Sequence, residues 1–558
     1  MNDARPYVWE ASYPPGVRWD APIRRLTLTG LLDEAVARFA DRPVIEFRGQ
    51  RMSYKGLGDW VAAAAAGFRR AGILAGDTVA LYLPNTPYHP IALFGALRAG
   101  ARVVMLSPLD APRVLAHKLA DSGARLLVTT DLPGMLPMAL RLLDEGQVTT
   151  LVVGADMAWG DASPGLGVPE RDAVVDFMDF VGGPDVAAPA TDPDEVALLQ
   201  YTGGTTGLPR AAMLSHANLA AAISMLDAWN VGMDPPFGPE DRTIGVLPLF
   251  HIYALTGVLL RSLSVGAEIL LRPRFDAQAV LADIEHRRAT YFPGVPTMWI
   301  ALAGVPGLEQ RDLSSLRIIA SGGAPLPAEI ATRLHELTGQ LLGGGWGMTE
   351  TSPTGSLIPA GVPYRPGMIG LPVPGVVMQI CALDDPSRVL GEGEIGEIRI
   401  KGPNVTRGYH NRPEENARAF VDGFFLTGDV GFMDADGYFF LVDRKKDMII
   451  SGGFNVYPAM IEGAIYEHPD VAECVVIGVP DPYRGQAAKA FITLKPGATG
   501  LTLDALKAFL AERVGRHEMP AALEIRDTLP KTPVGKLSRK DLADEEAARA
   551  GAMGAGPV

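Results

Sequence analysis

The sequence predicts an α/β fold with one large domain and one small domain. In the first part of the chain, short apolar segments alternate with helical segments, which is typical of parallel sheets covered by helices. Every residue from Asp443 to Asp447 is charged, and a short α+β stretch follows. A chain of 558 residues is also too long for a single core. We therefore expect a domain joint near Lys446, with domains over residues 1–445 and 446–558.

The first half of the chain is expected to build the parallel sheets. Residues 160–194 are rich in Gly, Pro and Asp and are expected to form a surface connection. The most apolar window, residues 244–260, is too short for a membrane span and is interrupted by Pro248, so we expect a strand, a turn and a buried helix there. Helices are expected at 61–71 and 91–99, and strands at 78–83, 103–106, 126–129, 150–153 and 196–201.

The second half is expected to add a hairpin and the small domain. The segments 423–427 and 438–442 read as two strands, with Asp436-Gly437 as the tight turn. The tail after Asp544 is mostly Ala, Glu and Gly and is expected to be frayed. In the small domain we expect strands at 448–450, 473–479 and 490–494, and helices at 461–467 and 503–514.

The composition excludes several classes of partner. Lys plus Arg number 50 and Asp plus Glu number 64, a net charge of -14, so binding to nucleic acid or to an anionic membrane through a basic surface is disfavoured. The two cysteines, Cys381 and Cys474, cannot make a disulfide framework and are typical of a reducing cytosol. The N-terminus has no apolar signal region and no segment is long enough for a transmembrane helix, so a cytoplasmic location is expected.

The strongest chemical signal is a glycine-rich loop after a buried strand, Tyr201-Thr-Gly-Gly-Thr-Thr-Gly-Leu-Pro-Arg210. Its glycines let successive backbone N–H groups point at one anion, and Arg210 adds a fixed charge. It is not a Walker A loop, because no Gly-Lys-Ser/Thr closes it. We expect a helix to follow from Asn218, which would favour phosphate binding. A flexible surface turn is the plainer interpretation.

Four further segments carry chemistry. Trp346 in Gly345-Trp-Gly-Met-Thr-Glu350 offers a face for stacking an adenine, and Glu350 is a hard oxygen ligand suited to Mg2+. Asp429 could accept hydrogen bonds from a ribose diol. The plainer interpretation of Trp346 is core packing, and that of Glu350 is a solvated helix start. The plainer interpretation of Asp429 is a turn aspartate, and that of the segment around Lys536 is a basic surface turn. The remaining segments are Ser321-Gly-Gly-Ala-Pro325 and Pro530-Lys-Thr-Pro-Val-Gly-Lys536, whose lysine could bridge a carboxylate and a phosphate.

Taken together and in this order, the motifs resemble the adenylate-forming superfamily of acyl-CoA synthetases, peptide-synthetase adenylation domains and luciferases. The resemblance runs from about Leu28 to Lys540 and includes Leu247-Pro-Leu-Phe-His251 and Gly294-Val-Pro-Thr297. It is nearest to bacterial medium- and long-chain fatty acyl-CoA ligases. It implies a large domain with a β-barrel-like subdomain, a hinged C-terminal domain, and a reaction that joins a carboxylic acid to coenzyme A using ATP and Mg2+ through an acyl-adenylate.

The resemblance also implies a role for each motif residue. Lys536, Glu350, Thr349 and His251 would be catalytic, with Glu350 also the metal ligand. Lys446 would be the hinge. Nucleotide binding would use Thr202, Gly203, Gly204, Thr205, Thr206, Gly207, Arg210, Gly323, Ala324, Pro325, Gly345, Trp346, Gly347, Asp429 and Arg444. Coenzyme A would pass Ser451, Gly452 and Gly453, and the acyl pocket would use His251, Tyr253, Thr256, Pro296, Thr297 and Trp299.

The sequence departs from the commonest family pattern in a few places. Gly203 replaces a frequent Ser, Arg210 a frequent Lys and Trp346 a usual Tyr, so the charge and the stacking face are kept. Ala211 stands where Gly is common, and Gly344 where Gln or Asn is often found. Several alternatives stay open: an aryl or dicarboxylic acid substrate, a carrier-protein thiol as acceptor, and an inactive nucleotide-binding homologue. A homodimer and a peripheral contact with a membrane are also left open.

Overall fold

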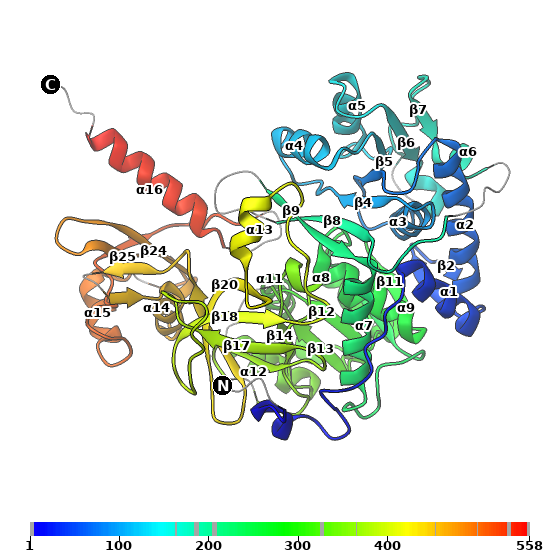
Figure 1. The fold of residues 1–558 in the computed structure, drawn as a ribbon. Coiled ribbons are helices and arrows are strands. Elements are labelled where there is room, and N and C mark those ends of the chain that lie inside the picture. Colours follow the sequence, from blue (N-terminus) through cyan, green and yellow to red (C-terminus); the bar gives the residue numbers. More distant parts are fainter. Residues whose placement is uncertain are drawn as a thin grey trace.

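The structure is a computed structural model, and it describes residues 5–161, 164–182, 189–202, 209–323, 328–363, 365–451, 454–498, 500–532 and 537–554. Within these residues the strands form three sheets, one of them confined to the C-terminal part of the chain (Figure 1). The predicted class, mixed α/β with a separate small C-terminal domain, is confirmed. No helix of the described chain is long and apolar enough to cross a lipid bilayer.

The seven-stranded sheet has the order β7-β6-β5-β3-β4-β8-β9. Its strands run parallel except for β9, which pairs antiparallel with β8. The expected strands are present, because each is a short apolar run that two helical layers can bury. The strands are β3 (Thr78–Leu81), β4 (Arg102–Met105), β5 (Leu126–Thr130), β6 (Thr150–Gly154), β7 (Val174–Asp176), β8 (Val196–Thr202) and β9 (Arg210–Ser215).

One expectation for this region was wrong. The segment 160–194 is not only a surface connection, because it contains β7 and the helix α6 (Phe177–Val181), whose Phe177 and Phe180 are buried. The helix expected from Asn218 is present as α7 (His216–Asn230). The strand β9, which was not predicted, lies between the glycine loop and α7, so the loop joins two antiparallel strands.

The largest sheet combines a parallel half with an antiparallel half. Its order is β17-β18-β20-β21-β16-β15-β14-β13-β12-β10-β11-β1-β2, with β19 beside β20. The antiparallel half is the part that compares with the expected barrel-like subdomain, and its order is open at β17. The strands are β1 (Pro43–Phe47), β2 (Gln50–Ser53), β10 (Arg242–Gly245), β11 (Glu268–Leu271), β12 (Tyr291–Gly294), β13 (Ile318–Ser321), β14 (Gly343–Trp346), β15 (Ser356–Leu357), β16 (Met368–Pro372), β17 (Val377–Cys381), β18 (Gly396–Lys401), β19 (Phe420–Val421), β20 (Phe424–Met433) and β21 (Phe439–Arg444).

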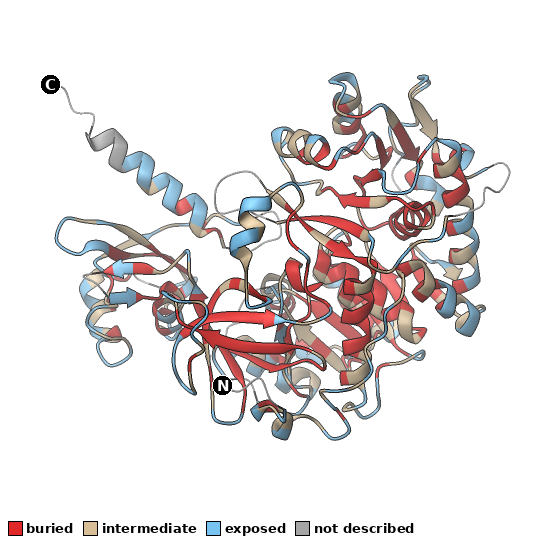
Figure 2. Cartoon of the chain, in the orientation of Figure 1, coloured by how far each residue is buried: buried red, intermediate tan, exposed pale blue. Residues whose placement is uncertain are grey.

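Helices cover these two sheets and bury their apolar faces (Figure 2). α3 is buried along nearly its whole length and ends at Arg98, with Ala99 as its C-cap. Gly100, whose φ is 87°, follows and closes it as expected. The helices are α1 (Leu28–Phe39), α2 (Tyr54–Arg70), α3 (Tyr88–Arg98), α4 (Pro112–Ser122), α5 (Leu136–Asp144), α8 (Ile252–Ala254), α9 (Arg261–Val265), α10 (Ala277–Arg287), α11 (Pro296–Ala303), α12 (Ala328–Thr338) and α13 (Pro413–Ala419), with short η1 (Val8–Ser12), η2 (Asp156–Trp159), η3 (Leu255–Leu260), η4 (Leu308–Gln310) and η5 (Thr349–Thr351).

The N-terminal segment supports the predicted β20–β21 hairpin from outside. Trp9 packs edge-on against Phe439 and lies against Gly437 in the turn of the hairpin. The Tyr13 hydroxyl donates to the Pro372 carbonyl at 2.6 Å. These contacts hold β16 and β21 together, and β21 ends at the predicted hinge.

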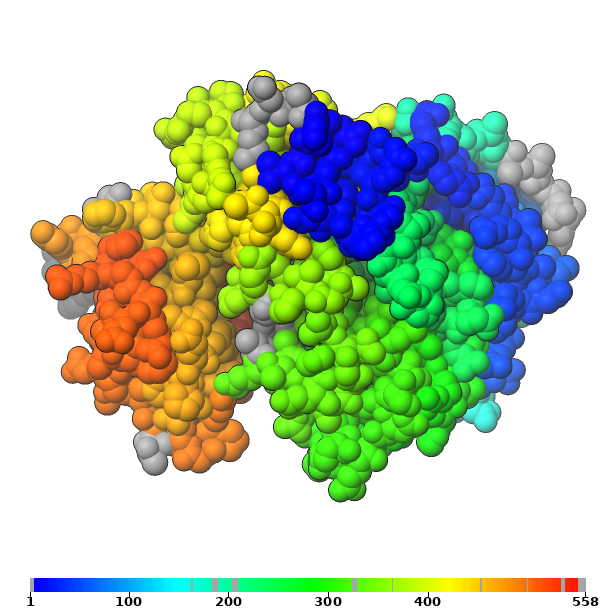
Figure 3. All heavy atoms as spheres, turned by 90° about the horizontal axis from the view of Figure 1, so that it is seen from below, coloured from blue at the N-terminus to red at the C-terminus, as the bar shows by residue number. Residues whose placement is uncertain are grey.

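The C-terminal domain has its own sheet, of order β23-β22-β25-β24 with β26 beside β25. Figure 3 shows it as a lobe separated by a hollow from the middle of the chain. The tail is not frayed as expected: α16 continues to Gly554, because Leu542 is buried and Lys489 pairs with Glu546 at 2.8 Å. The elements are β22 (Ile449–Ser451), β23 (Phe454–Val456), α14 (Pro458–Tyr466), β24 (Val471–Asp481), β25 (Gly485–Leu494), α15 (Leu503–Leu510), β26 (Ala522–Ile525) and α16 (Arg539–Gly554).

Candidate active site

The glycine-rich loop begins where β8 ends and finishes where β9 starts. Thr202 and Arg210 face each other across the two strands, so both ends of the loop are held in register. The Thr202 hydroxyl and the Arg210 Nε atom are buried and have no hydrogen-bond partner among the described residues. Buried polar groups without partners are uncommon in folded proteins, and here they suit a polar ligand. The loop residues Gly203, Gly204, Thr205, Thr206 and Gly207 lie outside the described residues.

A second group lies where β14 meets the β20–β21 hairpin. The Trp346 indole donates to the Asp429 carboxylate at 2.8 Å, and Arg444 lies 3.3 Å from the other Asp429 oxygen. Asp429 and Arg444 are direct partners across the two strands. Burial raises the pKa of Asp429, and Arg444 opposes that shift. Three residues predicted to hold one nucleoside therefore lie in contact, although they are far apart in the sequence.

Trp346 also fits its plainer interpretation as a core residue. Its side chain is 8% exposed and belongs to the largest hydrophobic cluster. The glycines on either side of it are needed for packing, since a Cβ at Gly347 would overlap the Pro353 carbonyl oxygen and one at Gly345 would overlap that of Ser356. Trp346 thus fixes Asp429 through its indole nitrogen, and it leaves only a small surface uncovered for stacking.

A third group surrounds Glu350. This carboxylate is 3% exposed, and the Tyr409 hydroxyl donates to it at 2.7 Å. The guanidinium of Arg210 lies 3.9 Å from the centre of the Tyr409 ring, and it pairs with Glu415 at 2.6 Å. Burial raises the pKa of Glu350, while Tyr409, Arg210 and Arg444 oppose the shift. The predicted phosphate ligand and the predicted metal ligand are therefore joined by one side chain, Tyr409.

Tyr409 and Glu415 were missed in the sequence. They lie in Gly408-Tyr-His-Asn-Arg-Pro-Glu-Glu415, a polar stretch between strands that carries no recognisable chemical motif. A tyrosine after a glycine and a glutamate in the first turn of a short helix are common features, so neither could be singled out without its spatial neighbours.

The predicted acyl pocket gives a mixed result. His251 caps α8, with its Nδ1 accepting from the Tyr253 N–H at 3.3 Å. The Tyr253 ring lies so close to Gly322 that a Cβ there would come within 2.9 Å of the ring. The Gln200 side chain donates to the Phe250 carbonyl at 2.9 Å, which ties β8 to this segment. His251 and Tyr253 therefore lie between the glycine-rich strand pair and the end of β13.

Two of the predicted pocket residues do not face open space. Trp299 is 0% exposed, packs in a core cluster, and donates its indole N–H to the Ala320 carbonyl at 3.0 Å. Thr256 is 1% exposed, and its hydroxyl donates to the Ser352 carbonyl at 2.9 Å. Trp299 therefore supports β13, and Thr256 supports the end of η5. Pro296 and Thr297, at the start of α11, are partly exposed.

The other predicted residues lie in two places, after β13 and at η5 in the large domain and near the turn between β21 and β22. Gly323, with a φ of 82°, follows β13, and Thr349 begins η5 beside Glu350. Lys446 is exposed in the turn between β21 and β22, and Ser451 is buried on β22, where it pairs with Gly485. The remaining predicted residues, Ala324, Pro325, Gly452, Gly453 and Lys536, lie outside the described residues.

The residues around Glu350 fit a magnesium ion that is shared with a nucleotide. In the described chain, no cluster of three or more His, Cys, Asp or Glu side chains could hold a metal alone. Mg2+ is commonly bound through one or two carboxylates together with substrate phosphates and water. A buried carboxylate whose side-chain donor is a neutral hydroxyl keeps its negative charge available for such an ion.

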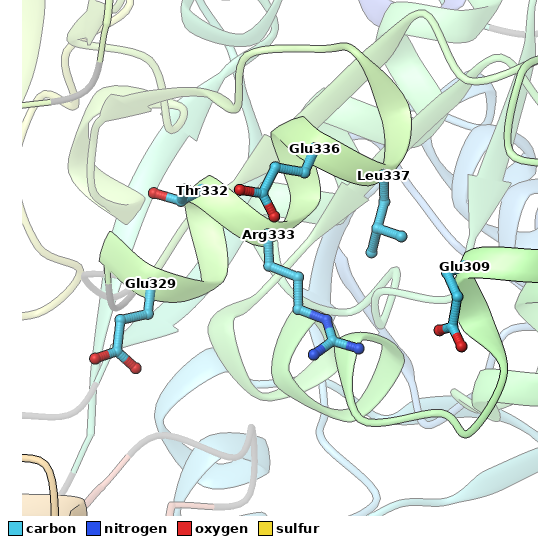
Figure 4. A pocket seen from close by; sticks show the side chains of 6 residues that line it. All are labelled: Glu309, Glu329, Thr332, Arg333, Glu336 and Leu337. Carbon is cyan, nitrogen blue, oxygen red and sulfur yellow. The ribbon is translucent and has the colours of Figure 1, made fainter.

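A surface hollow elsewhere does not involve any predicted site residue. It lies on α12 and η4 and is lined by acidic and polar side chains (Figure 4). One of them, Glu329, is 3.8 Å from Lys495 of the C-terminal domain, so this side of α12 also contacts the small domain. The lining residues are Glu309, Glu329, Thr332, Arg333, Glu336 and Leu337.

Comparison with known families places the chain in a class. Residues 32–410 match the model of the AMP-binding enzyme family, and residues 460–536 match that of the AMP-binding enzyme C-terminal domain. The chain therefore belongs to the AMP-binding enzyme family. It is an acyl-CoA synthetase, a ligase, as the motifs predicted, and acyl-CoA ligases of this family use ATP with Mg2+ and coenzyme A.

Individual relatives cover nearly the whole chain. A long-chain-fatty-acid–CoA ligase of Bacillus subtilis is 37% identical over 98% of this chain and 99% of its own length. A feruloyl-CoA synthase of Amycolatopsis is 38% identical over 88% of this chain and 94% of its own length. The crystal structure of ATP-bound MatB from Rhodopseudomonas palustris, 28% identical, covers 93% of this chain and 99% of its own with a TM-score of 0.83.

Proposed function

We propose that this AMP-forming acyl-CoA ligase activates a medium- or long-chain fatty acid. The observation that carries the proposal is the full-length similarity to a fatty-acid ligase, together with the Glu350 and Asp429 groups around the glycine-rich loop. An inactive homologue would not need to keep these buried acids, which cost free energy unless they serve a purpose.

In the first half-reaction, a carboxylate oxygen of the acid attacks the α-phosphorus of ATP. The bond between that phosphorus and the bridging oxygen breaks, pyrophosphate leaves and an acyl-adenylate forms. Asp429 and Arg444 would orient the ribose, Arg210 would hold the outer phosphates, and Lys536 would stabilise the charge that develops on the α-phosphate. Thr349 would donate to the same phosphate, and His251 would separate nucleotide from acid.

Glu350 would hold the magnesium ion, which supplies charge neutralisation for the phosphates when it is bound. The buried position of Glu350 supports this role, because the attraction between a carboxylate and a cation is stronger where water is excluded. Tyr409 keeps the carboxylate in one orientation.

In the second half-reaction, the coenzyme A thiolate attacks the acyl carbonyl and AMP leaves. The incoming thiolate would pass Ser451, Gly452 and Gly453. Lys536 would obstruct this second step if it stayed in place, so it would have to move aside. We propose that the domain of residues 446–558 rotates about Lys446, which lies exposed in a turn where its backbone dihedrals can change.

An aryl acid is the second candidate substrate. The 38% identity to a feruloyl-CoA synthase supports it, although that similarity covers less of the chain than the similarity to the fatty-acid ligase. Tyr253 borders the predicted pocket and offers a flat face suited to an aromatic ring. A cytoplasmic location, a homodimer and a peripheral membrane contact stay predictions.

The experiment that tests the function is release of AMP and pyrophosphate by the purified protein with ATP, Mg2+ and coenzyme A. The acids are hexanoate, dodecanoate, palmitate, adipate, benzoate and coumarate. We expect AMP formation that depends on coenzyme A and is fastest with a fatty acid. Fastest turnover with coumarate would favour the aryl alternative, and no release with any acid would contradict the fatty-acid proposal.

A further inference from the structure

We propose that Tyr409 and Glu415 are positioning residues of the adenylation half-reaction, which together set Arg210 and Glu350 in fixed relative positions. The inference deepens the proposed function and rests on it. Neither residue carries a role in the motifs recognised in the sequence. Both act on other side chains, so neither needs to touch the substrate.

The first contact sets the orientation of Arg210. Glu415 accepts from Arg210 Nη1 at 2.6 Å, and the guanidinium carbon lies over the Tyr409 ring, 3.9 Å from its centre. An arginine that is paired at one end and stacked on a ring loses most of its rotational freedom. The Arg210 Nε–H is buried and has no partner among the described residues, so a donor remains for an anion.

The second contact sets the orientation of Glu350. The Tyr409 hydroxyl donates to Glu350 Oε1 at 2.7 Å. A hydroxyl is neutral, so it orients the carboxylate without cancelling its charge, as an arginine or lysine would. One aromatic side chain therefore acts on both charged groups: its ring face supports the cation and its hydroxyl supports the carboxylate.

The backbone around Tyr409 makes this arrangement rigid. Asn416 accepts from the Tyr409 N–H at 2.7 Å and donates to the Tyr409 carbonyl at 2.8 Å. The same segment forms an isolated antiparallel bridge with β9: the His410 N–H donates to the Ala211 carbonyl and the Met213 N–H to the Gly408 carbonyl, each at 2.9 Å. Tyr409 therefore follows any movement of β9, whose first residue is Arg210.

The same segment is also tied to the backbone of Glu350. The Thr406 N–H donates to the Glu350 carbonyl at 2.7 Å, and the Thr406 hydroxyl donates to the Met213 carbonyl at 2.7 Å. Residues 406–410 therefore bridge the strand that starts at Arg210 and the turn that holds Glu350. This bridge explains how β9 and η5 could keep a phosphate ligand and a metal ligand in fixed relative positions.

The test uses calorimetric binding of ATP to the full chain, with Mg2+ and again with EDTA. Tyr409→Phe keeps the ring under Arg210 and removes the hydroxyl from Glu350. We expect ATP binding to weaken about 10- to 100-fold with Mg2+ and less than about twofold with EDTA. Glu415→Gln releases Arg210, whose proposed role is to hold the outer phosphates directly, so we expect about 3- to 10-fold weaker binding in both conditions.

The half-reactions supply a second measurement. Pyrophosphate exchange should fall in Tyr409→Phe by about 10- to 100-fold, while thioester formation from supplied acyl-adenylate changes less than about twofold. Tyr88→Phe removes another buried hydroxyl, which donates to the Ala155 carbonyl, and Glu414→Gln removes the neighbouring exposed charge on α13. Both controls should bind ATP like the unmodified chain.

Two results would overturn the proposal. If Tyr409→Phe binds ATP normally with Mg2+, its hydroxyl does not position Glu350. If it loses the same affinity with Mg2+ and with EDTA, the role of Tyr409 is only structural. The binding test needs no turnover, so it stands apart from failure of the proposed function, which would appear as an unmodified chain that forms no AMP with any acid.

Discussion

Glu350 and Glu462 are both glutamates with largely buried carboxyl groups, but they lie in different domains and have different partners. Glu350 accepts from a neutral tyrosine hydroxyl at 2.7 Å. Glu462, on α14, lies 2.5 Å from the Arg539 guanidinium and also accepts from the Val476 N–H at 2.7 Å. Burial raises the pKa of both carboxyls, that of Glu462 to about 7.

The difference between them separates a binding group from a structural one. Glu462 has its counter-ion in the protein, and Arg539 also approaches Asp443 and Asp447 at 3.2 and 3.4 Å. This cluster joins the end of β21 to the start of α14 and α16, so it stabilises the joint between the domains. Glu350 has no arginine or lysine in contact among the described residues, and its charge remains available for an incoming cation.

The largest effect is expected from breaking the structural cluster. Arg539→Met leaves three carboxylates without their shared cation, so the free energy of unfolding should fall by about 2–4 kcal/mol. Urea unfolding at pH 8 measures this. Arg549→Met, which removes a cation whose side chain is 50% exposed, should cost less than about 1 kcal/mol. Equal losses in the two variants would contradict the structural role of the cluster.

Removing the charge of Glu350 should slow adenylation without lowering the free energy of unfolding. Glu350→Gln should slow adenylation about 100- to 1000-fold. Because a desolvated charge is removed, the free energy of unfolding should stay the same or rise. Pyrophosphate exchange and urea unfolding on the same preparation measure both. A variant that unfolds more easily and keeps its adenylation rate would make Glu350 a structural residue like Glu462.

The pH dependence of stability should show the raised pKa of Glu462. The pKa of Glu462 is raised from its ordinary 4.5 to about 7 in the folded chain, so between these values the folded state binds more protons than the unfolded state. Stability therefore falls as the pH rises through this window, by roughly 1–3 kcal/mol. Glu462→Gln should lack this component, as urea unfolding at pH 5 and pH 8 can test. If the free energy of unfolding changes with pH in the same way in Glu462→Gln and in the unmodified chain, Glu462 does not make this contribution.

The smallest effect is expected at the turn between the two regions. Lys446→Pro fixes one backbone dihedral where the proposed rotation needs it to change. We expect thioester formation to slow about tenfold more than adenylation, measured by the separate half-reactions. Lys446→Ala, which keeps the backbone free, should run both half-reactions at nearly the normal rate. Equal impairment of both steps in the proline variant would count against a hinge at this residue.

Much of the fold could be predicted because its signals are local. Short apolar runs such as residues 78–81 and 126–130 form strands because helices can cover them, and Gly100 ends α3 at the expected position. Predictions failed where a distant contact outweighed composition. The tail became a helix because Lys489 and a buried Leu542 hold it. The strand β9 was not predicted, and it forms between the glycine loop and the expected helix because it pairs with β8.

The candidate site divides in the same way. The glycines and the acids of the motifs identify the family from short stretches of sequence, because phosphate and ribose impose a residue type at a given spacing. The contacts between motifs are not local: Tyr409 meets Glu350 across 59 positions and Arg210 meets Glu415 across 205. Such pairs depend on which strands share a sheet and in which register, and chain folding brings them together without any signal in the neighbouring residues.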